Sequence, residues 1–189
     1  MKESVLFSRF GRVIERVVRY PNGAEHSFDI WTKNWRNENE FAIVLPFYTH
    51  SQSVMLVREY YPAPHRFHWG LPAGNVEKLR HGSALNAAKS ELQEEAALCG
   101  GQWYELLQSS RGMAQDKYQM DWSHLYLCVN PEDQSDGSKA QHEDEELIER
   151  HMVPLQRLRE LAIQGEFQAN QTACVLLALE KIRELGLSE

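Results

Sequence analysis

The stretch SELQEEAAL, residues 90–98, places three glutamates within five positions. The sequence predicts a helix from Ser83 to about Leu98, because Ser83 is a favourable N-cap and CGG follows as a stop signal. Glu91, Glu94 and Glu95 share one face of this helix, where like charges repel. That face is either a solvated surface or a site for a hard divalent cation, which prefers carboxylate oxygens. A separate apolar stripe is formed by Leu85, Ala88, Leu92 and Ala96.

A second stretch, LPAGNVE at residues 71–77, lies between a short predicted strand and this helix. Pro72 and Gly74 favour a tight turn that can direct a backbone carbonyl toward the glutamates. Together the two stretches resemble the Nudix box, whose pattern is glycine, five residues, glutamate, seven residues and then Arg-Glu-apolar-x-Glu-Glu-x-Gly-apolar. The residues that match this pattern are Gly74, Glu91, Leu92, Glu94, Glu95 and Leu98.

The resemblance extends to both sides of the box. FAIVLPFYTHSQSVMLVREYYPAPHRFHWGLPAG, residues 41–74, is similar to the strands that precede the box in the ADP-ribose and nucleotide-sugar pyrophosphatase branch. EDEELIERHMVPLQRLRELAIQGEFQANQTACVLLAL, residues 143–179, resembles the C-terminal part of that branch. The resemblance implies an α/β fold, a Nudix-type α/β/α sandwich with a mixed β-sheet. The predicted order of strands, helix, strands and helices agrees with such a sandwich or with an α+β arrangement.

Three positions depart from the family pattern. The segment between the glycine and the helix is two residues longer than in the pattern. Gly82 stands where the pattern has its first glutamate, Ser90 where it has arginine, and Ala97 where it has the late glycine. In the family, that glutamate and arginine help to tie the loop to the helix. Arg80 or His81 could take over this role, so we expect a modified loop around an intact set of carboxylates.

The resemblance implies a magnesium or manganese site. It assigns Glu91 and Glu95 as direct ligands, with the Ala73 carbonyl beside them, and Glu94 as a further ligand or catalytic partner. Such a cation neutralises phosphate charge and acidifies a bound water. Without the resemblance, the same glutamates could be an ordinary solvated face.

A general base must also take a proton from the attacking water. In this branch it often comes from a later acidic loop, and HEDEEL at residues 142–147 is the corresponding stretch. We therefore expect Glu143 to be the base and Glu145 an extra metal ligand, against the alternative of a solvated acidic loop.

Four further residues are expected to bind substrate. Arg58 is similar in position to a phosphate-contacting arginine of the branch, although a surface salt bridge is the alternative. Glu59 belongs either to the core or to the site, because strand alternation does not decide between them. Trp69 has the flat aromatic face that stacks on a nucleobase, with a core role as the alternative. Lys117 lies where the branch has a substrate loop, and its alternative is a plain mobile loop.

Composition excludes several classes of protein. The 189 residues carry a formal net charge of -7, which argues against a nucleic-acid or anionic-membrane partner. The three cysteines have no C-x-x-C spacing, so a disulfide framework or zinc knuckle is not expected. No apolar run is long enough for a membrane span and the N-terminus lacks a signal sequence, so a cytoplasmic location is expected.

We expect two regions, an N-terminal β-hairpin region at residues 1–40 and a Nudix hydrolase domain at 41–189. The hairpin is predicted because VIERVVRY and EHSFDIW flank the turn sequence PNGA. By resemblance it is a dimerisation element, which implies a homodimer.

The implied activity is magnesium-dependent hydrolysis of the pyrophosphate of ADP-ribose or a nucleotide sugar, giving a nucleoside monophosphate and a sugar phosphate. Alternatives are a pyrophosphatase for dinucleoside polyphosphates or NADH, a non-catalytic nucleotide-binding module, and an acidic structural protein.

Overall fold

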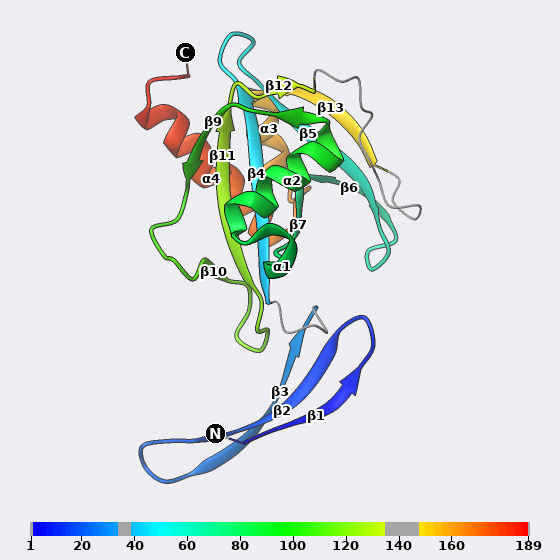
Figure 1. Cartoon of the computed structure of the whole chain (residues 1–189), viewed down its shortest axis with the longest axis vertical. Coiled ribbons are helices and arrows are strands. Elements are labelled where there is room, and N and C mark those ends of the chain that lie inside the picture. The colour runs from blue at the N-terminus through cyan, green and yellow to red at the C-terminus, as the bar shows by residue number, and fades with distance from the viewer. Residues whose placement is uncertain (1, 34–38, 135–147, 189) are drawn as a thin grey trace.

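The computed structural model describes residues 2–33, 39–134 and 148–188. Its centre is a mixed sheet of eight strands in which β10, β11, β4, β5 and β13 follow one another, with β11 parallel to β4 and β5 antiparallel to both of its neighbours (Figure 1). The sheet's long strands are β4 (Glu40–Tyr48), β5 (Ser53–Tyr61), β11 (Trp122–Val129) and β13 (Ile148–Pro154). Its short strands are β6 (Arg66–Gly70), β7 (Ala73–Asn75), β9 (Gln102–Glu105) and β10 (Met113–Ala114).

Helices cover both faces of this sheet. α1 (Lys78–His81) and α2 (Ala84–Ala96) lie on one face, and α3 (Leu155–Ile163) and α4 (Ala169–Glu184) lie on the other (Figure 1). Alternation along β4 produces two cores, because Ala42 and Val44 pack toward α2 whereas Ile43, Leu45 and Phe47 pack toward α3 and α4. The expected α/β/α sandwich with a mixed sheet is confirmed.

The N-terminal region is a separate antiparallel sheet of three strands, β1 (Lys2–Ser8), β2 (Arg12–Arg19) and β3 (Glu25–Thr32). The predicted hairpin is β2–β3, and Gly23 in its turn has a φ of 85°, a conformation that favours glycine. The hairpin prediction omitted β1, which pairs with β2 as an outer strand. Another small pair, β8 (Leu98–Cys99) with β12 (Glu132–Asp133), lies beyond the end of α2.

A buried carboxylate joins the N-terminal sheet to the body. Asp121 is 5% exposed and accepts hydrogen bonds from the Thr32 hydroxyl at 2.5 Å and from the Lys33 amide at 3.0 Å. Nearby, the Trp31 amide donates to the Tyr118 carbonyl at 2.9 Å. These contacts hold the end of β3 beside the segment that leads into β11.

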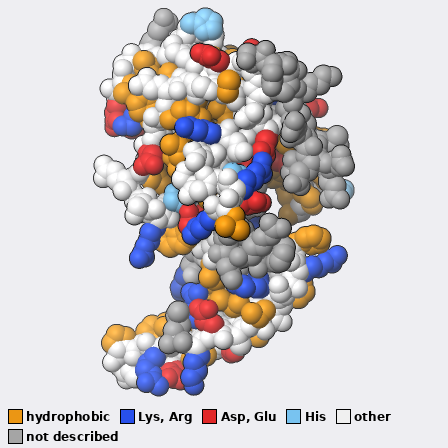
Figure 2. Space-filling model, in the orientation of Figure 1, with side chains coloured by type: hydrophobic (Ala, Val, Ile, Leu, Met, Phe, Trp, Pro, Cys, Tyr) orange, Lys and Arg blue, Asp and Glu red, His pale blue; other side chains and the backbone are white. Residues whose placement is uncertain are grey.

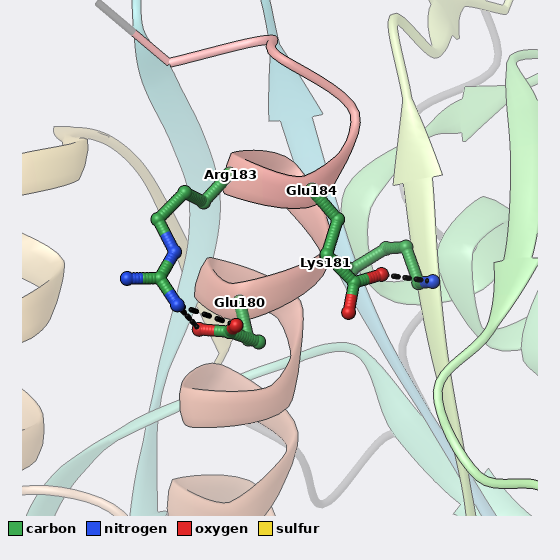
Figure 3. A network of polar contacts seen from close by, with 4 residues as sticks. All are labelled: Glu180, Lys181, Arg183 and Glu184. Carbon is green, nitrogen blue, oxygen red and sulfur yellow. Dashed lines mark hydrogen bonds and ion pairs between the residues drawn. The ribbon is translucent and has the colours of Figure 1, made fainter.

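The outer surface of α4 carries two ion pairs, each spanning one helical turn. Arg183 pairs with Glu180, and Lys181 pairs with Glu184, both at 2.5 Å (Figure 3). Exposed pairs of this kind add little to stability, so α4 is held mainly by its buried face. None of the helices in the described ranges is long and apolar enough to cross a membrane.

Candidate active site

The predicted glutamate helix is α2. Its N-cap is Ser83, whose hydroxyl accepts a hydrogen bond from the Asn86 amide at 3.2 Å, as expected. Ala88 and Leu92 are buried on the face that packs against the sheet. The glutamates are offset from this face, and all three line a pocket of about 510 Å³ between α2, β5 and β7. We call this cavity the glutamate pocket. The acidic residues that line it are Glu59, Glu77, Glu91, Glu94 and Glu95.

β7 lies directly against α2 at Gly74. A Cβ atom placed on Gly74 would lie 2.0 Å from Glu91 Oε1 and 2.3 Å from its Cδ. Gly74 does not have a positive φ, so glycine is required by this close approach and not by the backbone conformation. The neighbouring Ala73 amide donates a hydrogen bond to Glu95 Oε2 at 3.1 Å. The structure therefore brings together Ala73, Gly74, Glu91 and Glu95. Ala73 contacts Glu95 through its amide, whereas the sequence prediction concerned its carbonyl.

The donor set of the pocket fits a hard divalent cation. Carboxylate oxygens are the ligands that magnesium and manganese prefer, and four carboxylates from β5 and α2 line one cavity. Within the described residues, however, no three potential ligands are gathered into a ready-made metal centre. Glu94 and Glu95 instead contact groups of the protein, so cation binding would require these side chains to exchange partners.

The loop that departs from the family pattern forms the short helix α1. Gly82 follows it with a φ of 71°, and its amide donates to the Lys78 carbonyl at 3.0 Å, which closes the helix. This conformation explains why glycine stands at 82, where the pattern has glutamate. Arg80 forms an ion pair with Glu94, and the Ser90 hydroxyl donates to the same carboxylate at 3.0 Å. The tie between loop and helix is therefore kept with its charges reversed, the cation on the loop and the anion on the helix.

His81 provides a second attachment of this loop. Its side chain is buried and lines the glutamate pocket, and its Nδ1 accepts a hydrogen bond from the Glu77 amide at 3.1 Å. The Asn86 side chain donates to the His81 carbonyl at 2.9 Å. Both residues named from the sequence as possible replacements for the missing tie thus contribute to it.

A tyrosine that the sequence prediction omitted completes one wall. Tyr61 lies two residues after Glu59 on the same face of β5, and both line the glutamate pocket. Burial, together with the charge of Glu59, raises the pKa of Tyr61 to about 12. Its hydroxyl is therefore a neutral hydrogen-bonding group at physiological pH. Lys33, Phe41 and Gln171 also line the cavity, and no local sequence signal distinguishes them.

Two of the predicted substrate residues lie away from the pocket lining. Arg58 alternates with Glu59 along β5 and points to the other side, where its guanidinium lies 5.3 Å from the Phe67 ring centroid. It also forms an ion pair with Glu149 at 3.6 Å. Trp69 packs on the same side, with its centroid 6.0 Å from the Arg58 guanidinium. Of the predicted substrate residues on β5 and β6, the structure places only Glu59 with the box glutamates.

Of the three remaining predicted residues, one lies in another cavity and two are outside the described residues. Lys117 lies in a different cavity, beside the N-terminal sheet, and its ammonium group is 5.0 Å from the Tyr118 ring centroid. Glu143 and Glu145 fall within residues 135–147, which lie outside the described residues.

Comparisons with known proteins agree with this architecture. A search of curated protein sequences found no significant match. Among solved structures, one described as an ADP compounds hydrolase superposes with a TM-score of 0.76 at 19% sequence identity, covering 99% of this chain and 97% of the other. At that identity the likeness shows the fold. The NUDIX domain family model matches residues 38–173, which is well over half of the chain. The protein therefore belongs to the NUDIX family of hydrolases.

Proposed function

We propose that this protein hydrolyses the pyrophosphate bond of a nucleoside diphosphate linked to a sugar, with ADP-ribose as the first substrate to test. The products are a nucleoside monophosphate and a sugar phosphate. The observation that carries the proposal is the glutamate pocket, where Glu59 and three box glutamates line one cavity beside a backbone that approaches closely at Gly74. The solved structure described as an ADP compounds hydrolase supports the choice of an ADP compound.

In this proposal Glu91 and Glu95 hold a magnesium or manganese ion, with Glu94 completing the site after it leaves Arg80. The cation, when bound, neutralises phosphate charge and lowers the pKa of a coordinated water. The Ala73 amide orients the Glu95 carboxylate through its hydrogen bond. We propose Glu143 as the group that accepts the proton from the attacking water, with Glu94 as the second possibility and Glu145 as an additional ligand.

The test measures nucleoside monophosphate released from ADP-ribose, UDP-glucose and GDP-mannose, each with magnesium, with manganese and with a chelator. NADH and a dinucleoside polyphosphate form the comparison panel. Glu95→Gln should abolish release with the fold intact, and Glu180→Gln on the exposed face of α4 is the matched control. Unchanged release by Glu95→Gln would contradict the proposal. Tight nucleotide binding without release from any compound would instead identify a non-catalytic binding module.

We also propose that the N-terminal sheet mediates homodimer formation. β1 is an outer strand of that sheet, and all seven of its residues are exposed. Val5, Leu6, Phe7 and Phe10 are each more than half exposed, and Figure 2 shows hydrophobic side chains among the charged ones on this region. Exposed edge strands and apolar patches are surfaces on which a second chain docks. Light scattering should report a dimer that Phe7→Ser and Phe10→Ser together convert to a monomer; a monomeric wild type would refute this.

A further inference from the structure

The ion pair between Arg80 of α1 and Glu94 of α2 lies where solutes can reach it. Both residues line the glutamate pocket, and their side chains are 52% and 30% exposed. The Ser90 hydroxyl donates a hydrogen bond at 3.0 Å to Glu94 Oε1, the same oxygen that the Arg80 guanidinium contacts. One oxygen of a box glutamate therefore accepts from two donors of the protein.

The tie between loop and helix uses a carboxylate that the proposed cation site also needs. In the family pattern the tie joins a loop glutamate to a helix arginine, and neither belongs to the run of box glutamates on the helix. Here the anion of the tie is Glu94, which is itself a proposed ligand. A divalent cation at Glu94 would repel the Arg80 guanidinium, because two positive charges would then share one short-range partner. Cation binding by Glu94 therefore weakens its pair with Arg80.

The backbone of Arg80 is fixed, whereas its side chain is free to exchange partners. The Arg80 and His81 amides donate to the Glu77 carbonyl at 3.1 Å and 2.8 Å, and the Asn86 side chain donates to the His81 carbonyl at 2.9 Å. The guanidinium is held by Glu94 through an exposed ion pair, and such pairs add little to stability. Leaving Glu94 therefore costs little, and a released guanidinium stays within one side-chain length of the pocket.

A phosphate group is the partner that suits the released guanidinium. The lining of the glutamate pocket holds five glutamates against two strongly basic residues, Lys33 and Arg80. A diphosphate that enters among these carboxylates needs cationic partners of its own. The planar donors of arginine match phosphate oxygens two at a time, and such charge-assisted hydrogen bonds are strong.

We propose that Arg80 passes from Glu94 to a phosphate oxygen of the nucleotide when Glu94 turns to a divalent cation. Arg80 is then a substrate-contacting residue of this chain. Cation and nucleotide each strengthen the binding of the other, because coupling between two ligands is reciprocal. Ser90 keeps its hydrogen bond to Glu94 and orients the carboxylate after Arg80 has left. The inference rests on the proposed function and deepens it.

Three variants separate the charge of Arg80 from its shape. Arg80→Met removes the guanidinium and keeps most of the length of the side chain. Arg80→Lys keeps the positive charge and loses the planar fork. Arg157→Met is the matched control, because it breaks an exposed pair with Glu160 on α3 and removes an arginine that does not line the glutamate pocket.

The probes are manganese alone and α,β-methylene ADP, whose bridging bond resists cleavage. In calorimetry Arg80→Met should bind manganese up to about fivefold more tightly than wild type. With saturating manganese, it should bind the analogue about tenfold more weakly, the loss expected for a hydrogen bond to a charged group. Arg80→Lys should recover part of that affinity, and Arg157→Met should match wild type in both measurements.

The decisive comparison is made with a chelator in place of manganese. Nuclear magnetic resonance titrations, which detect weak binding, should then show the same low affinity for the analogue, or none, in wild type and Arg80→Met. The reason is that Glu94 keeps Arg80 when no cation competes for the carboxylate. The melting temperature of Arg80→Met should stay close to that of wild type, because the exposed pair adds little to stability.

Wild-type affinity for the analogue in Arg80→Met with manganese would overturn the phosphate contact. A loss of the same size with chelator would overturn the transfer, because Arg80 would then reach the phosphate whether or not a cation holds Glu94. Equal losses in Arg80→Met and Arg80→Lys, each with a lowered melting temperature, would show a purely structural arginine and also overturn the inference.

Failure of the proposed function gives a different result. In that case the wild type releases no monophosphate from any substrate, while the analogue titrations still report on Arg80. If the wild type binds no analogue even with manganese, both proposals fail.

Discussion

Gly74→Ala tests whether the close approach of β7 to α2 exists to position a carboxylate. The new methyl group would lie 2.0 Å from Glu91 Oε1, whereas ordinary contacts begin at about 3.5 Å. The carboxylate must therefore move by about 1.5 Å. A misplacement of this size at a reacting centre costs on the order of 100-fold in rate, equivalent to about 2.7 kcal/mol of transition-state stabilisation.

Stability should change much less than activity. The clashing atoms are at the end of a flexible side chain, and the backbone of Gly74 is in a region open to alanine. An unstrained Gly→Ala change even reduces the entropy of the unfolded chain, so the free energy of unfolding should stay within about 1 kcal/mol of wild type. Gly74→Ala thus separates a requirement of the site from a requirement of the fold.

The measurement compares kcat/KM for ADP-ribose, manganese affinity by calorimetry and denaturant unfolding in the same variants. Gly165→Ala provides the opposite control, because Gly165 has a φ of 74° and open space around its missing side chain. It should lose about 1–2 kcal/mol of stability through backbone strain and keep its activity per folded molecule. Gly74→Ala with wild-type manganese affinity and kcat/KM would refute the positioning argument.

Three further outcomes follow from the charges and thiols. Arg80→Met should raise manganese affinity by up to about fivefold, because it removes the cation that competes for Glu94; weaker binding in calorimetry would contradict this. At pH 8 a maleimide should label the exposed Cys99 and spare Cys128 and Cys174 until the protein is denatured. The reason is that burial raises the pKa of both buried thiols to about 12. Label found on the buried thiols by mass spectrometry of the native protein would contradict this. The same two thiols have a pKa of about 9 when unfolded, so their contribution to the free energy of unfolding should be complete below about pH 9 and be lost as pH rises toward 12. Denaturant titrations at increasing pH would measure this loss. A free energy of unfolding that does not change between about pH 9 and 12 would contradict it.

Local sequence rules predicted much of the site. Helical spacing placed Glu91, Glu94 and Glu95 on one face of α2, and the structure turns that face toward a common cavity. The glycine of LPAG was expected as a turn residue, and it proves to matter through its contact with Glu91. These features depend on periodicity and on short-range spacing, which a sequence displays directly.

The sequence showed that side chains alternate along β5, but it did not show which of the two faces is turned toward the glutamates. Either Arg58 or Glu59 could have faced the glutamates, because a strand has two faces and only the pairing with β6 and β13 selects one. The structure selects Glu59 and brings Tyr61 with it. The outer strand β1 was missed for a related reason, since its residues are all exposed and carry no alternating burial pattern.

By itself, the sequence determined the carboxylate face of α2 and the departures at Gly82 and Ser90, because each is written in residue type and spacing. Its resemblance to the Nudix family implied the sandwich fold, which the order of elements alone left open to an α+β arrangement. Only the tertiary structure decided how those departures are accommodated. Arg80 and Glu94 are separated by fourteen positions and meet because α1 folds back against α2. His81 likewise joins the pocket lining only because the fold buries its side chain there. Both depend on contacts between elements, which residue spacing alone does not specify.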